Sequence, residues 1–200
     1  MEKFLGNKKI IIRFISLYSL GLLLFFISWI TSYLLLPDGM LNGFGALAKL
    51  AGDSAAETLG LEFIKIFGLN IIGLLFIIIG NYILRVNSFS FGYLIPLTWM
   101  ILYGITLGTN SFSIPLEEPM APTLAILGRS GLYEMMAATL LAVSTNSISV
   151  NKSESFSSKS KPIPKNERNS LKKEQWTAIG IAVLILAVAA LREAYMIVKL

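Results

Sequence analysis

Five ionisable or amide side chains stand inside stretches of this sequence that are otherwise apolar. Within a membrane such residues are costly, so each needs either a functional or a structural reason. The carboxyls are the most informative of them, because a carboxyl in lipid is either protonated or paired with a cation. The five residues are Asn70, Arg129, Glu134, Arg192 and Glu193.

Glu134 lies about ten residues into the apolar run 124–150, with small residues at helical spacing around it. These small residues are Gly131, Ala138 and Ala142. Small side chains allow a neighbouring helix to approach closely. We therefore expect this face of the helix, and Glu134 with it, to point into a helix bundle. There Glu134 is either protonated or paired with Arg129 or Arg192.

Arg192 and Glu193 lie in the last turns of the apolar run 175–198, among Ala189, Ala190 and Ala194. With the orientation derived below, all five polar residues fall in the outer half of the bilayer. A shared polar cluster is therefore expected. Two interpretations stay open, a structural network of paired charges and a role in transport or partner recognition.

The composition speaks against an enzyme. The chain has no His and no Cys, which removes the commonest general base, thiolate metal ligands and disulfides. Neither a Gly-x-Ser-x-Gly motif nor a phosphate-binding loop occurs, and two separated Glu are a weak signal for acid–base catalysis. We predict no catalytic residue, no metal site and no cofactor.

The elements that position these residues are predicted to be membrane helices. Hydrophobic residues make up 54% of the 200 residues and charged residues 14%, whereas soluble domains carry about 25% charged residues. A spanning helix needs about 20 mostly apolar residues. The prediction is a single all-α domain, a polytopic membrane helix bundle of about five transmembrane helices. Their expected ranges are 11–36, 66–84, 89–108, 124–150 and 175–198.

Basic residues set the expected orientation, with the N-terminus inside and the C-terminus outside. With five crossings, twelve Lys and Arg of the polar segments fall on the inner side and three on the outer side, as the positive-inside rule requires. The net charge of +5 is therefore a topology signal, and we expect no nucleic acid. The first helix could be a cleaved signal peptide, but its apolar stretch is too long, which favours an uncleaved anchor.

Polar and irregular segments connect the expected helices. The basic segment 151–174 predicts a flexible cytoplasmic linker, which serves as a topology signal or also touches anionic lipid heads. A short surface helix is expected at 46–61. Three prolines in 114–122 exclude a regular helix there, so this segment lies at the interface or re-enters the membrane. Gly104 and Gly108 form a Gly-x-x-x-Gly pair, which predicts close helix packing.

Two segments and an isolated Asn resemble the stage II sporulation protein M family of small bacterial and archaeal membrane proteins. The stretch from Gly131 to Ala138 is similar to the family's Gly-x-x-Glu followed by small residues. The stretch from Ala189 to Tyr195 is similar to its closing Ala-x-x-x-Glu-Ala-aromatic pattern, and Asn70 matches an Asn on its second helix. Many members have Pro-His-Gly before the Glu, where this chain has Arg129, Ser130 and Gly131, so no role of that His carries over.

The resemblance implies a multi-pass accessory protein of a bacterial or archaeal cell membrane, with protein partners beside the lipid bilayer. The namesake works with peptidoglycan hydrolases, and other relatives accompany bacteriocin genes. The expected function is an accessory or scaffold subunit of a larger membrane complex. The alternative is a membrane component of a transporter or exporter, including bacteriocin maturation, export or immunity.

Overall fold

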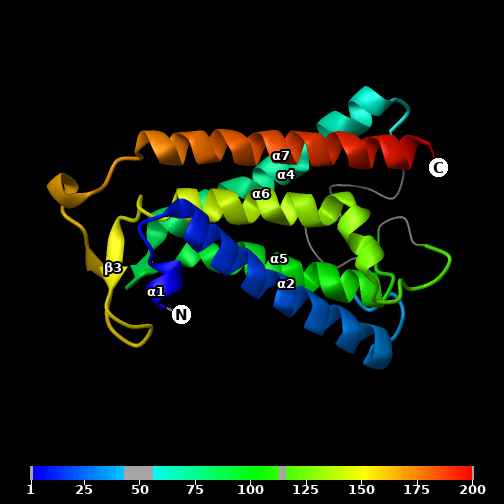
Figure 1. The fold of residues 1–200 in the computed structure, drawn as a ribbon, viewed down its shortest axis with the longest axis horizontal. Coiled ribbons are helices and arrows are strands. Elements are labelled where there is room, and N and C mark those ends of the chain that lie inside the picture. Colours follow the sequence, from blue (N-terminus) through cyan, green and yellow to red (C-terminus); the bar gives the residue numbers. More distant parts are fainter. Residues whose placement is uncertain (1, 43–55, 113–115, 200) are drawn as a thin grey trace.

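The computed structural model describes residues 2–42, 56–112 and 116–199, and this part of the chain is mostly helical. Five long helices lie side by side and alternate in direction, so that the N-terminus and the C-terminus are at opposite ends (Figure 1). The helices are α1 (Glu2–Leu5), α2 (Ile10–Leu35), α4 (Leu59–Ile83), α5 (Leu94–Gly108), α6 (Ser130–Ser144) and α7 (Lys173–Val198), with 3-10 turns η1 (Phe91–Tyr93), η2 (Leu124–Gly128) and η3 (Lys165–Glu167).

Four of these helical segments are long and apolar enough to cross a membrane, namely Ile10–Leu35, Leu59–Ile83, Phe91–Gly108 and Lys173–Val198. This confirms the predicted membrane helix bundle. The helix expected at 124–150 differs, because only its central 15 residues form α6. At 1.5 Å per residue α6 is about 22 Å long, which is shorter than the roughly 30 Å hydrocarbon core.

Helix α4 begins seven residues before the apolar run that predicted it. Its N-cap is Thr58, whose hydroxyl accepts a hydrogen bond from the backbone N–H of Leu61 at 3.3 Å. Two charged residues, Glu62 and Lys65, made the first turns resemble a loop in the sequence. In the structure they form an ion pair on those turns, with a nitrogen–oxygen distance of 3.7 Å.

Small side chains line the interior of the bundle, as predicted from their spacing. Helices α6 and α7 pack against each other, and the residues buried along them are mostly alanines. The buried alanines of the two helices are Ala137, Ala138, Ala142, Ala178, Ala182, Ala189, Ala190 and Ala194. Large apolar side chains such as Leu23, Leu75 and Leu184 are exposed instead, which is the arrangement of a bundle surrounded by lipid.

Gly104 and Gly108 bring α5 against α2, which confirms the predicted role of the Gly-x-x-x-Gly pair in packing within the bundle. A Cβ atom added at Gly104 would lie 2.6 Å from the carbonyl oxygen of Phe25. One added at Gly108 would lie 2.7 Å from the backbone nitrogen of Tyr33. The two helix backbones can therefore touch only because these positions lack a side chain.

A small sheet closes the end of the bundle near the N-terminus (Figure 1). Its strand order is β2-β1-β3-β4, with β1·β3 parallel and the other two pairs antiparallel. Two strands lie in the segment predicted as a flexible linker, which is therefore structured in part. The strands are β1 (Arg85–Val86), β2 (Phe89–Ser90), β3 (Asn151–Ser153) and β4 (Lys161–Pro162).

The connections at the opposite end are described in part. The surface helix predicted at 46–61 lies mostly outside the described residues, and its last three positions belong to α4. Within the Pro-rich segment 114–122, the backbone carbonyl of Met120 accepts a hydrogen bond from the indole nitrogen of Trp29 at 2.8 Å. The backbone N–H of Met120 donates to the carbonyl of Leu107 at 3.2 Å. This loop thus folds back onto α2 and α5, and re-entry into the membrane stays a prediction.

Candidate functional site

The carboxyl groups of Glu134 on α6 and Glu193 on α7 lie close to each other. The side-chain amide of Asn70 on α4 donates a hydrogen bond to Oε1 of Glu134 at 3.0 Å. The hydroxyl of Ser130 donates to Oε2 of Glu193 at 3.3 Å. Three helices therefore converge on this pair of acids, which we call the carboxyl pair.

The sequence around the carboxyl pair explains why the helices can meet there. Ser130 and Glu134 are four residues apart and so lie on one face of α6. Gly131 leaves room for the ring of Tyr103 from α5, because a Cβ atom there would lie 2.6 Å from the Tyr103 hydroxyl oxygen. On α7, the buried Ala190 precedes Glu193 by three residues and lets α7 approach closely.

The predicted cluster of five residues is formed only in part. The structure brings Asn70, Glu134 and Glu193 together, as expected. Arg129 and Arg192 are exposed, and among the described residues neither forms an ion pair. The proposed pairing of Glu134 with an arginine is therefore wrong, because Arg129 precedes the first turn of α6 and Arg192 points to the outside of α7.

Two contributors were missed from the sequence, the hydroxyl of Ser130 and the ring of Tyr103. Ser130 stands within the same short stretch as Glu134, and its spacing of four residues could have indicated it. Tyr103 had no such signal, because it comes from a different helix and lies among apolar residues of α5.

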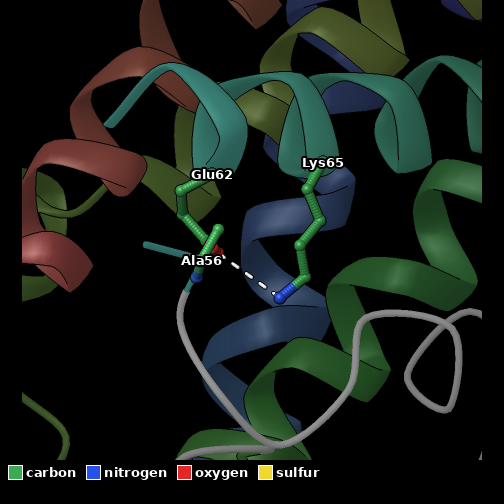
Figure 2. Close-up of polar contacts among 3 residues, drawn as sticks. All are labelled: Ala56, Glu62 and Lys65. Carbon is green, nitrogen blue, oxygen red and sulfur yellow. Dashed lines mark hydrogen bonds and ion pairs between the residues drawn. The ribbon is translucent and has the colours of Figure 1, made fainter. Parts of the chain in front are cut away.

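The buried acid Glu62 shows what an ordinary structural carboxylate looks like in this chain. Glu62 near the start of α4 is 3% exposed, accepts a hydrogen bond from the N–H of Ala56 at 2.6 Å and pairs with Lys65 (Figure 2). This carboxylate sits near a helix N-terminus and has a cation beside it, both of which stabilise the negative charge. The carboxyl pair has a second acid where Glu62 has a lysine.

The carboxyl pair is suited to binding a proton or a small cation. Two ionised carboxyl groups at close range repel each other, so one of them holds a proton readily. If that proton leaves, two negative charges face each other beside the amide of Asn70, and a cation would then stabilise the site. Within the described ranges, no group of three His, Cys, Asp or Glu side chains gathers, so the pair does not form a dedicated metal cage.

A second polar centre lies at the opposite end of α6, where the helix stops within the bundle. The last carbonyl groups of a helix lack intrahelical partners, and lipid cannot supply any. Here Asn81 of α4 donates to the carbonyl of Ala142 at 2.7 Å, and Gln175 of α7 donates to that of Ser144 at 2.6 Å.

The carbonyl between these two is bound by a buried arginine. Nη2 of Arg13, from α2, donates to the carbonyl oxygen of Val143 at 2.9 Å. The positive charge also suits the negative end of the α6 dipole. Three successive carbonyls of α6 are thus each capped by a different helix, and we call Arg13, Asn81 and Gln175 the α6 C-terminal cap.

Comparisons of the chain with family models, curated proteins and solved structures found no match. The resemblance to the stage II sporulation protein M family therefore stays a prediction from the short stretches that carry it.

Proposed function

We propose that the protein is the membrane component of a transporter or exporter, and that the carboxyl pair takes up and releases a proton or a small cation. One observation carries the proposal, the meeting of Glu134 and Glu193 without a basic partner among the described residues. Carboxyls inside membrane bundles mark proton and ion pathways in general. A site built only for structure would be expected to resemble Glu62, with its lysine.

The neighbours of the pair suit reversible binding. Asn70 and Ser130 donate hydrogen bonds to the two acids, and such donors can stay in place whether the site holds a proton or a cation. The expected orientation places the pair one to two helical turns from the outer ends of α6 and α7. Protons or cations from the outside would therefore reach it over a short distance.

The test is chemical modification with a lipid-soluble carbodiimide, which reacts with carboxyls that are protonated in apolar surroundings. In native membranes we expect mass spectrometry to find the adduct on Glu134 or Glu193. The loop acid Glu117, which is exposed, serves as the internal control and should stay unmodified. Na⁺, K⁺ or Ca²⁺ added beforehand should protect the pair if that cation binds there.

The matched variants are Glu134→Gln and Glu62→Gln. The first should abolish modification at position 134 and change the yield at Glu193, whereas the second should leave both unchanged. Equal modification of the carboxyl pair and of Glu117, insensitive to pH and to all three cations, would overturn the proposal.

A second function, an accessory or scaffold subunit of a larger complex, is favoured by Arg192. This arginine is exposed on α7, directly after exposed Leu191 and one turn after exposed Val188, on the side expected to face lipid. A cation on a lipid-facing position is stabilised by a lipid phosphate or by an acidic residue of a partner subunit. The resemblance to the stage II sporulation protein M family supports an acidic residue of a partner subunit, in the cell membrane of a bacterium or an archaeon.

Affinity purification from native membranes distinguishes the two functions. A stoichiometric partner that is lost in Arg192→Leu but retained in Lys199→Leu would support the accessory role. Lys199 lies at the end of the same helix, with its ammonium 4.3 Å from the centre of the Tyr195 ring, so it controls for loss of a positive charge. Purification of the chain alone would leave the transport proposal as the better one.

A further inference from the structure

Three basic residues stand directly opposite one another on three neighbouring strands of the small sheet. Arg85 of β1 pairs with Lys152 of β3, and Lys152 pairs with Lys161 of β4. Residues in register on neighbouring strands project from the same face of a sheet, and like charges placed in this way destabilise it. The arrangement therefore needs a compensating negative charge.

The same three residues line one pocket of about 400 Å³ at this end of the bundle. The turn that follows β3 adds Lys159, so four cations surround the pocket with one acid, Glu154. None of the four cations forms an ion pair within the part of the chain that the structure describes. The pocket therefore carries a net positive charge that the described chain itself does not neutralise.

The walls of the pocket also offer hydrogen-bond donors. Nε of Arg85 is buried and has no hydrogen-bond partner among the described residues. Ser153 and Ser158 hold the turn closed through their hydroxyls, which are 2.7 Å apart, and both line the pocket. A guanidinium together with ammonium groups is the combination that binds phosphate in proteins.

We propose that this pocket binds a phosphate group. The position favours the headgroup of an anionic phospholipid, because the sheet lies at the basic end of the bundle, where the positive-inside rule places the inner leaflet. Two exposed aromatic residues at the same end, Phe156 beside the pocket and Trp176 at the start of α7, are 72% and 61% exposed. Such aromatics are typical of the membrane interface.

The phosphate site explains why part of the expected flexible linker forms strands, which the carboxyl pair does not explain. The segment 151–162 forms strands where Lys152 pairs with Arg85 and where Lys161 pairs with Lys152. A phosphate shared among the three strands would hold β1, β3 and β4 together and so join the end of α4 to the chain that follows α6. This inference is independent of the proposed transport function, since the two sites lie at opposite ends of the bundle.

The test measures thermal unfolding of the full chain in nanodiscs of phosphatidylcholine, alone or with 30% phosphatidylglycerol. A ligand that binds only the folded state stabilises it, and the stabilisation increases with the ratio of ligand concentration to Kd. We expect the phosphatidylglycerol discs to raise the unfolding midpoint of the wild type, and Lys152→Gln and Arg85→Gln to lose most of this shift. Titration with the lipid should show affinity about fivefold weaker for each lost cation.

Lys165→Gln is the matched control, since Lys165 belongs to the same basic segment but does not line the pocket. It should respond as the wild type does. A second arm adds inorganic phosphate to phosphatidylcholine discs at constant ionic strength. A stabilisation by inorganic phosphate equal to that by the lipid, and lost in Lys152→Gln, would identify a soluble phosphate compound as the ligand.

The proposal would be overturned if Lys152→Gln, Lys165→Gln and the wild type responded equally to both anions, because that result means unspecific attraction. It would also fail if neither anion stabilised the wild type. Lys152→Gln removes a repulsion from the sheet, so it should fold at least as well as the wild type without anions. A loss of the response in this variant therefore reports binding rather than misfolding.

Discussion

Nη2 of Arg13 lies 2.9 Å from the carbonyl oxygen of Val143 and donates a hydrogen bond to it across 130 residues of sequence. The guanidinium also donates to the carbonyls of Asn7 and Lys8 before α2. The Arg13 side chain thus supplies hydrogen bonds both to a carbonyl at the C-terminal end of the short helix α6 and to the turn before α2. It therefore connects the start of α2 to the C-terminal end of α6.

Replacing Arg13 by Met should lower the free energy of unfolding by about 2 kcal/mol, because three carbonyls lose a charged donor. Thermal or denaturant unfolding in mild detergent measures the change. Lys9→Met is the matched control, since Lys9 is exposed and its loss removes the same positive charge from the N-terminal segment. Equal destabilisation by both variants would show that charge alone, and not the contact with α6, matters.

The Gly-x-x-x-Gly pair gives a second prediction. Gly104→Ala forces α5 away from the carbonyl of Phe25 and should lower the free energy of unfolding by about 1–3 kcal/mol. Gly180→Ala on α7 is the control, because a Cβ there meets nothing within 4 Å and a helical alanine is favoured over glycine. If the two variants unfolded at the same temperature, the close contact between α2 and α5 would be in doubt.

The carboxyl pair predicts a difference between two substitutions at one position. Glu134→Gln keeps an acceptor for the amide of Asn70 and removes the second acid, so stability should stay the same or rise. Glu134→Leu leaves that amide without its partner and should lower the free energy of unfolding by about 1–3 kcal/mol. A double-mutant cycle with Asn70→Ala isolates the contact, and a coupling energy near zero would contradict it.

Features that depend on local periodicity could be predicted from the sequence. The apolar runs predicted the long helices, and the small residues around Glu134 predicted that this acid faces neighbouring helices. The α6 C-terminal cap was not predictable, because Arg13, Asn81 and Gln175 meet only after three helices have packed. Arg13 in particular was read only as a basic residue that sets the topology, so its contact with the end of α6 was not expected.

The short elements also escaped prediction for physical reasons. Strands of two or three residues show no alternation that a sequence pattern could reveal. The length of α6 was overestimated since apolar residues continue past Ser144 to Val150, although the chain there leaves the helix. The chain instead donates hydrogen bonds to the last carbonyls of α4, from Ser149, Val150 and Asn151. These residues are therefore not available to continue α6.

Whether the short helix α6 crosses the membrane decides the topology, and cysteine labelling can test it. The chain has no cysteine, so Asp38→Cys and Ser157→Cys each introduce a single thiol at an exposed position. Three helices, α4, α5 and α6, separate the two sites. In intact cells a membrane-impermeant maleimide should label position 38 at once and position 157 only after permeabilisation, because the basic end lies inside. Labelling of both positions from one side would mean that α6 does not cross, and the carboxyl pair would then need another route to the outer surface.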